Sequence, residues 1–140
     1  MRSRHILVIE DSDEDFETVM DAARRASVPH PIVRATSGAE GLRKLRSGAG
    51  NRHALPLLLL FDLNTPGDDG RDVLRAIRSE DALSTLPIVV LSASANPHDL
   101  KFCYANGANA YHVKPVDHAL HLRTLEQVFA YWLGCVVLLA

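Results

Sequence analysis

Short hydrophobic runs alternate along the chain with longer segments of mixed polarity. The runs are Ile6–Ile9, Ile32–Ala35, Leu57–Phe61, Ile88–Leu91 and Ala110–Val113. The third run has no alternation of apolar and polar positions, which is typical of a parallel strand covered by helices on both faces. We therefore expect five short strands, with the third buried in the middle of a sheet.

Between these runs the hydrophobic period becomes helical. Apolar residues recur at i, i+3, i+4 and i+7 spacings, as in Phe16, Val19, Met20 and Ala23, in Val73, Leu74 and Ile77, and in Leu125, Val128, Phe129 and Trp132. Asn96 and Pro97 predict the start of the fourth helix, and Gly107 predicts its end. With right-handed crossovers, five βα units predict an α/β fold: a doubly wound, five-stranded parallel sheet of the flavodoxin-like (βα)5 type in the order 2-1-3-4-5.

The composition is that of one ordinary globular domain. The chain has 140 residues, of which 47% are hydrophobic, and its 15 basic and 17 acidic side chains leave a formal charge of −2. A nucleic-acid-binding domain would carry a basic stripe, so we expect no nucleic-acid partner.

Cys103 and Cys135 form no pairing motif and no apolar leader opens the chain, which predicts a reduced, cytoplasmic location. The longest apolar run, 130–140, is shorter than the roughly 20 residues of a membrane helix, so we expect no membrane partner.

Polar side chains gather where the predicted strands end. They are Glu10 and Asp11 after the first strand, Asp62 after the third, Ser92 after the fourth and Lys114 after the fifth. In this fold the carboxyl ends of the strands line the ligand-binding cleft, so we expect these five side chains to lie together. The second strand ends in Thr36 and Ser37, and at the sheet edge it contributes nothing obvious to this site.

This combination of groups indicates phosphoryl transfer. Three carboxylates held close together raise one another's pKa unless a cation compensates. Mg²⁺ suits them, because it prefers oxygen ligands and is held by one or two carboxylates together with a phosphate. The hydroxyl and the ammonium supply donors for the oxygens of a transferring phosphoryl group. The reaction indicated is phosphorylation of an aspartate that acts as the nucleophile.

Four stretches, in this order, resemble the response-regulator receiver domain of two-component signalling over essentially the whole chain. They are the segments 6–12, 62–70, 91–93 and 111–115, with separations of 51, 30 and 22 residues from Asp11 to Asp62 to Ser92 to Lys114. The resemblance implies that Asp62 is the phosphoacceptor and that Asp11 binds Mg²⁺ directly. It further implies that Glu10 acts on the metal through water and that the main-chain carbonyl of Asn64 is another ligand.

The same resemblance implies a switch. Ser92 and Lys114 would contact the phosphoryl group, and Tyr111 matches an aromatic position that rotates inward when the hydroxyl residue moves. The peptide bond between Lys114 and Pro115 is expected to be cis. The phosphorylated site would then bias the face made by the fourth helix, the fifth strand and the fifth helix.

Three positions depart from the usual pattern of the family. Glu10 replaces the commoner aspartate, Thr65 stands where methionine or leucine is usual, and Asp68 stands where an apolar residue is usual. None of these changes removes a catalytic group. An additional acid after Asp62 could alter the metal affinity or the fit to a kinase.

Later segments are similar to the single-domain regulators that accompany bacterial phytochromes. The similarity is carried by residues 86–97, by 103–104 and 107–111, and by Tyr131, Trp132 and Leu133. It implies that the partner is a light-sensing histidine kinase. The downstream protein is not indicated, and two alternatives stay open: a phosphate sink, and an interaction module that works without phosphorylation.

Other functions fit the residues less well. An FMN carrier of the same fold needs phosphate donors after its first strand, where this chain has five acids between Glu10 and Asp15. A phosphatase with an aspartyl nucleophile usually has a second aspartate where this chain has Asn64. His118 and His121 have helical spacing but no third ligand, so a solvated helix face is favoured over a zinc site.

The end of the chain exceeds what the receiver fold needs. We expect the receiver domain to span residues 1–134, with Gly134 ending the last helix. Residues 135–140 are apolar and β-prone and would expose hydrophobic surface on a monomer. We expect this tail to be an arm that makes a homodimer; the face between the fourth and fifth helices is the alternative interface.

Overall fold

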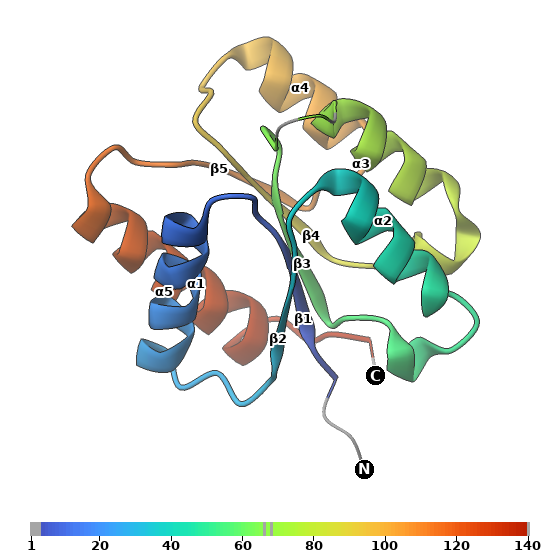
Figure 1. Ribbon diagram of the computed structural model, residues 1–140, viewed down its shortest axis with the longest axis horizontal. Coiled ribbons are helices and arrows are strands. Elements are labelled where there is room, and N and C mark those ends of the chain that lie inside the picture. Colours follow the sequence, from blue (N-terminus) through green and yellow to red (C-terminus); the bar gives the residue numbers. More distant parts are fainter. Residues whose placement is uncertain (1–3, 66, 68, 140) are drawn as a thin grey trace.

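A five-stranded parallel sheet forms the centre of the molecule, in a computed structural model that describes residues 4–65, 67 and 69–139. The strands are β1 (Ile6–Ile9), β2 (Ile32–Ala35), β3 (Leu58–Asp62), β4 (Ile88–Ser92) and β5 (Ala110–Val113). Their order is β2-β1-β3-β4-β5, which confirms the predicted doubly wound, flavodoxin-like fold (Figure 1).

Two layers of helices cover the sheet. The helices are α1 (Asp13–Arg25), α2 (Gly38–Ser47), α3 (Gly70–Ser79), α4 (Pro97–Ala105) and α5 (His118–Gly134), and two 3₁₀ turns, η1 (Arg52–Ala54) and η2 (Asp81–Leu83), lie between them. Figure 1 shows α1 and α5 side by side on one face of the sheet and α2, α3 and α4 on the other.

The alternation of side chains along the strands divides the core in two. Leu7 and Ile9 of β1 point to the layer of α2, α3 and α4, where Leu74 is fully buried. Ile6 and Val8 point to the layer of α1 and α5, where Phe129 is buried. The strands are covered on both faces, which explains why the run in β3 is uniformly apolar.

Strands β3 and β4 each run one residue further than the hydrophobic pattern predicts. Asp62 is the last residue of β3 and pairs with Leu91, and Ser92 is the last residue of β4 and pairs with Val113. Their backbones are therefore fixed by the sheet rather than by a loop. This placement orients both polar side chains at the carboxyl edge.

The predicted helix ends are confirmed where they were most specific. Asn96 caps α4 by accepting a hydrogen bond from the His98 amide, and Pro97 is the first helical residue. Gly107 adopts a positive φ of +95° just beyond the helix. Helix α5 ends at Gly134, and the described tail residues after it form no strand. Within the part of the chain that the structure describes, no helix is long and apolar enough to cross a membrane.

Candidate functional site

Asp62 lies at the carboxyl end of the central strand and is 7% exposed. Its Oδ1 accepts a hydrogen bond of 3.1 Å from the Asn64 amide, which orients the carboxylate. The chain then turns back into α3 at Gly70, where a Cβ would overlap the main-chain carbonyl of Leu63. A glycine is therefore required for the close approach that places α3 beside the end of β3.

Three carboxylates meet at the end of β3, one of them that of Asp62, as the sequence predicts. One oxygen each from Glu10, Asp11 and Asp62 lie within 4.8 Å of one another. Glu10 is 2% exposed, whereas Asp11 is open to solvent. An all-oxygen group of this kind, open on one side, fits a hard divalent cation that keeps part of its water shell.

The ammonium of Lys114 lies among the carboxylates. Its Nζ donates to Asp62 Oδ2 at 2.9 Å, to Glu10 Oε1 at 3.0 Å and to Asp15 Oδ2 at 3.1 Å. Burial by itself would lower the pKa of Lys114, but the charges of Asp62 and Glu10 outweigh it and raise that pKa above its ordinary value. The lysine is therefore a fixed positive charge beside the Asp62 carboxylate.

Glu10 is the carboxyl group most perturbed by this environment. Burial, and next the negative charge of Asp62, raise the pKa of Glu10 to about 7, although Lys114 acts in the opposite direction. The Ser12 amide also donates to Glu10 Oε2 at 3.2 Å. A group with this pKa changes its charge near neutral pH, and a bound cation would favour its ionised form.

The expectation of a cis peptide before Pro115 is wrong. The described residues contain no cis peptide bond. The Lys114 amide donates to the Ser92 carbonyl at 2.7 Å, so the sheet ladder between β4 and β5 continues to this residue. The trans bond is the intrinsically favoured isomer, and Lys114 reaches Asp62 from it.

Ser92 is fully buried beside Asp62 and accepts two hydrogen bonds. The Asn64 side-chain amide donates to Ser92 Oγ at 3.0 Å, and the Ser94 amide donates to the same oxygen at 3.1 Å. The hydroxyl is thus held between the loop after β3 and the loop after β4. A movement of Ser92 Oγ would therefore alter a hydrogen bond to each of the two loops.

Ser94 connects Ser92 to the neighbouring helices. Its hydroxyl donates to Asp99 Oδ2 at 2.6 Å, and Arg71 of α3 binds the other oxygen of Asp99. The hydrogen bond from Ser94, followed by Arg71, lowers the pKa of Asp99. The Tyr111 hydroxyl donates to the Ser94 carbonyl at 2.8 Å. Tyr111 therefore contacts the segment that follows Ser92 rather than the acidic cluster.

Two residues at the site were missed in the sequence. Asp15 is the third carboxylate on Lys114, and its only sequence signal was the acidic first turn of α1. Arg34 of β2 donates to the main-chain carbonyls of Glu10 and Asp11. The second strand, from which no obvious contribution is expected, therefore does contribute to the site; an arginine inside a four-residue strand was the available signal.

The remaining sequence expectations have mixed outcomes. Thr65 is 3% exposed, and its hydroxyl has no hydrogen-bond partner among the described residues. Asp68 lies outside the described residues.

His118 is exposed as expected, but His121 is only 7% exposed, and burial lowers its pKa. The prediction of a solvated face is therefore wrong for His121, which is a buried residue of α5.

Comparison with known proteins shows which family the chain resembles. Residues 6–126 match the model of the response regulator receiver domain. The chain is 35% identical over 129 residues to the probable methanogenesis regulatory protein FilR2 of Methanothrix harundinacea, covering 92% of this chain and 83% of that protein. It is 30% identical over 134 residues to response regulator Rcp1 of Synechocystis sp., covering 95% and 91% of the two chains.

Solved structures of phytochrome response regulators have the same fold. The phosphorylated cyanobacterial phytochrome response regulator RcpA superposes with a TM-score of 0.90 at 31% identity and covers 99% of this chain and 100% of its own. The Mn²⁺-bound form of Rcp1 has a TM-score of 0.89 at 29% identity, with coverages of 98% and 99%. The structural similarity therefore extends over nearly the whole of each compared chain.

Proposed function

Because this chain belongs to the response regulator receiver domain family, we propose that it accepts a phosphoryl group on Asp62 from a sensor histidine kinase. The observation that carries the proposal is the contact of 2.9 Å between Lys114 Nζ and Asp62 Oδ2, inside a cluster of three carboxylates. An ammonium held against a buried carboxylate is placed for the oxygens of a phosphoryl group bonded there.

The transfer needs little chemistry from the protein beyond position and charge. A carboxylate oxygen of Asp62 forms a bond to phosphorus with its own electron pair. The phosphorus–nitrogen bond of the kinase phosphohistidine breaks, and the nitrogen keeps the bonding electrons. Lys114 stabilises the charge on the phosphoryl oxygens, and Ser92 donates a hydrogen bond from its hydroxyl to one of them.

We propose that Mg²⁺ is the cation of this site. Asp11, Asp62 and the main-chain carbonyl of Asn64 would hold it directly, and Glu10 would act through water. The close approach of the carboxylate oxygens supports this set of ligands, as does the divalent cation in the structure of the relative Rcp1. When bound, Mg²⁺ supplies positive charge to the phosphoryl oxygens.

The output of the proposed reaction is a change at the α4–β5–α5 face. When Ser92 turns toward a phosphoryl oxygen, it must release the Asn64 side chain and the Ser94 amide. The loop before α4 is then free to move, together with Tyr111, whose hydroxyl is bonded to Ser94. Such a local charge event that biases a two-state element is a common signalling device.

The partner we propose is a phytochrome-type histidine kinase that meets this chain in the cytoplasm. The similarity to RcpA and Rcp1 over nearly the whole of their lengths supports this assignment.

A homodimer is proposed as well, through residues 135–140. Its support is the exposure of apolar side chains in the tail, 96% for Val137 and 55% for Leu139.

The proposed phosphorylation is tested by incubation with a small acyl phosphate and Mg²⁺, followed by intact-mass analysis. The expected result is the addition of one phosphoryl group, which Asp62→Asn abolishes and the exposed control Asp81→Asn retains. An unshifted wild-type mass would favour the phosphorylation-independent module. A shift that survives Asp62→Asn would overturn the assignment of the acceptor. A phosphorylated chain that alters no protein contact would favour the phosphate sink.

A further inference from the structure

The loop between β1 and α1 carries two of the proposed metal ligands, and one guanidinium from the neighbouring strand holds it. Arg34 Nε donates to the carbonyl of Glu10 at 2.9 Å, and Nη2 donates to the carbonyl of Asp11 at 3.0 Å. The remaining nitrogen, Nη1, donates to Asp13 Oδ1 at 2.7 Å. Resting on the function proposed above, we infer that Arg34 is a positioning residue that fixes Glu10 and Asp11 for the cation.

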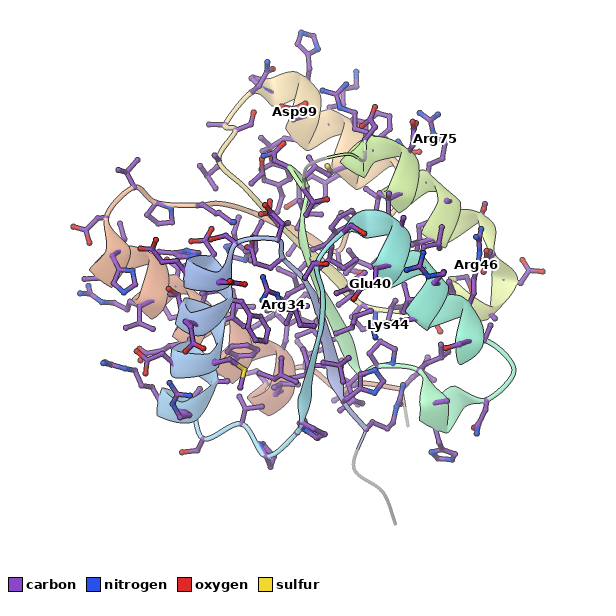
Figure 2. The ribbon with its side chains drawn as sticks, in the orientation of Figure 1. Arg34, Glu40, Lys44, Arg46, Arg75 and Asp99 are labelled. Carbon is purple, nitrogen blue, oxygen red and sulfur yellow. The ribbon has the colours of Figure 1, made fainter. Side chains whose placement is uncertain are left out.

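Arg34 is itself held from two directions. Its backbone is paired with Val8 in the sheet register, so the side chain starts from a fixed point at the edge of the sheet. The guanidinium lies 4.9 Å from the centre of the Phe16 ring of α1, and the side chain is 22% exposed. Figure 2 shows the side chain in the space between β2 and α1. A planar cation stacked on an aromatic ring loses little freedom when it forms further hydrogen bonds.

The hydrogen-bond acceptors of Arg34 are not the atoms proposed to bind the metal. Arg34 binds the main-chain carbonyls of Glu10 and Asp11 and none of their carboxylate oxygens, which lie close to those of Asp62. Its charge is balanced by the ion pair with Asp13 rather than by a proposed ligand. The loop is therefore ordered without loss of ligand atoms and without an unpaired positive charge beside the metal site.

Ordering this loop in advance should increase the affinity for the cation. The carboxylates of Glu10, Asp11 and Asp62 repel one another when they are ionised, so a loosely held loop would separate them. A loop whose carboxylates have moved apart must be ordered again each time the cation binds, and this ordering lowers the affinity for the cation. Partners that orient metal ligands from outside typically contribute about 10-fold to 100-fold in metal affinity.

The geometry also requires an arginine rather than any cation. Three acceptors at residues 10, 11 and 13 are bound by three different nitrogens of one planar fork. A lysine at this position has one nitrogen at the end of its chain and cannot bind all three in this arrangement. Arg34→Lys therefore separates the effect of the fork from the effect of charge.

The test is the affinity of the purified 140-residue chain for Mg²⁺ alone, measured by isothermal titration calorimetry without a phosphodonor. We expect the Kd for Mg²⁺ to rise ~10-fold in Arg34→Gln and by a similar factor in Arg34→Lys. The control is Arg24→Gln, an exposed arginine of α1 paired with Asp21, for which the Kd should be unchanged. Hydrogen exchange of the amides of residues 10–13, without metal, should be faster in both Arg34 variants.

Each outcome decides a separate point. A wild-type Kd in both Arg34 variants, or unchanged exchange of the loop amides, would overturn the positioning role and leave the phosphorylation proposal intact. A wild-type chain that binds no Mg²⁺ would instead contradict the metal dependence proposed above. If Arg34→Gln does not fold, Arg34→Lys keeps the charge and the apolar part of the side chain and supplies the same two readouts.

Discussion

Lys114 Nζ lies 2.9 Å from Asp62 Oδ2, a contact between two residues that are 52 positions apart in the sequence. Asp62 ends β3 and Lys114 directly follows β5, and these two strands are not neighbours because β4 lies between them. The lysine crosses the end of β4, and the same ammonium also binds Glu10 and Asp15. One side chain just beyond the edge strand β5 thus compensates carboxylates from the β1–α1 loop, from α1 and from the end of β3.

Removal of this ammonium should destabilise the chain when no divalent cation is present. In Lys114→Gln, the buried carboxylates of Glu10 and Asp62 lose their compensating charge, and we expect the free energy of unfolding at about pH 8 to fall by about 2 kcal/mol. Added Mg²⁺ should restore part of the loss, because a ligand that binds only the folded state stabilises it. Urea denaturation with and without Mg²⁺ measures both effects.

The matched control for this prediction is Lys101→Gln, an exposed lysine of α4. Its stability should stay within about 0.5 kcal/mol of the wild type, as is usual for surface positions. Equal stability of Lys114→Gln and the wild type in a chelator would mean that the lysine does not compensate the acids.

Glu10 should make stability depend on pH in a defined window. Its pKa is raised from 4.5 to about 7, so between these values the folded chain retains a proton that the unfolded chain has released. The free energy of unfolding therefore falls as the pH rises from 4.5 to about 7, by at most about 3 kcal/mol from this group. Glu10→Gln should remove that decrease, and the difference between the two proteins is read from urea denaturation in a chelator across this range.

Glu17→Gln, an exposed acid of α1, is the control and should follow the wild-type pH dependence. Parallel curves for the wild type and Glu10→Gln would contradict the raised pKa. Mg²⁺ should flatten the wild-type curve, because a cation at the site favours the ionised carboxylate.

The framework of this site can be predicted from the sequence because it depends on strand ends. Hydrophobic runs locate the strands, and in a parallel sheet all their carboxyl ends lie at one edge, which is why strand positions alone predict that Asp62, Ser92 and Lys114 lie together. The role of Arg34 could not be predicted from the sequence, because its partners are main-chain carbonyls. Their direction follows from the path of the loop and not from the periodic pattern of side chains. The burial of His121 likewise depends on how α5 packs against α1.

The contact between Ser94 and Asp99 should restrain the start of α4. Asp99→Asn removes the charge that binds Arg71 and weakens the acceptor of the Ser94 hydroxyl, so the loop before α4 loses its link to α3. We expect amide hydrogen exchange in residues 95–101 to become ~5-fold faster, while exchange in β4 stays unchanged. Hydrogen exchange with mass spectrometry measures this, and Asp81→Asn in η2 is the control. Unchanged protection in residues 95–101 would show that the ion pair does not restrain the loop.

Deletion of the apolar tail should change the oligomeric state. Val137 and Leu139 are exposed to 96% and 55%, and the described tail is tied to the domain by the Arg4 guanidinium, which donates to the Leu139 carbonyl at 3.0 Å. A second copy would remove this apolar surface from water, so we expect a dimer that becomes a monomer when residues 135–140 are deleted, as measured by light scattering. The matched variant Leu120→Lys probes the alternative face, because Leu120 is a 47% exposed apolar residue of α5. A truncated chain that stays dimeric, together with a monomeric Leu120→Lys, would move the interface from the tail to the face formed by α4 and α5.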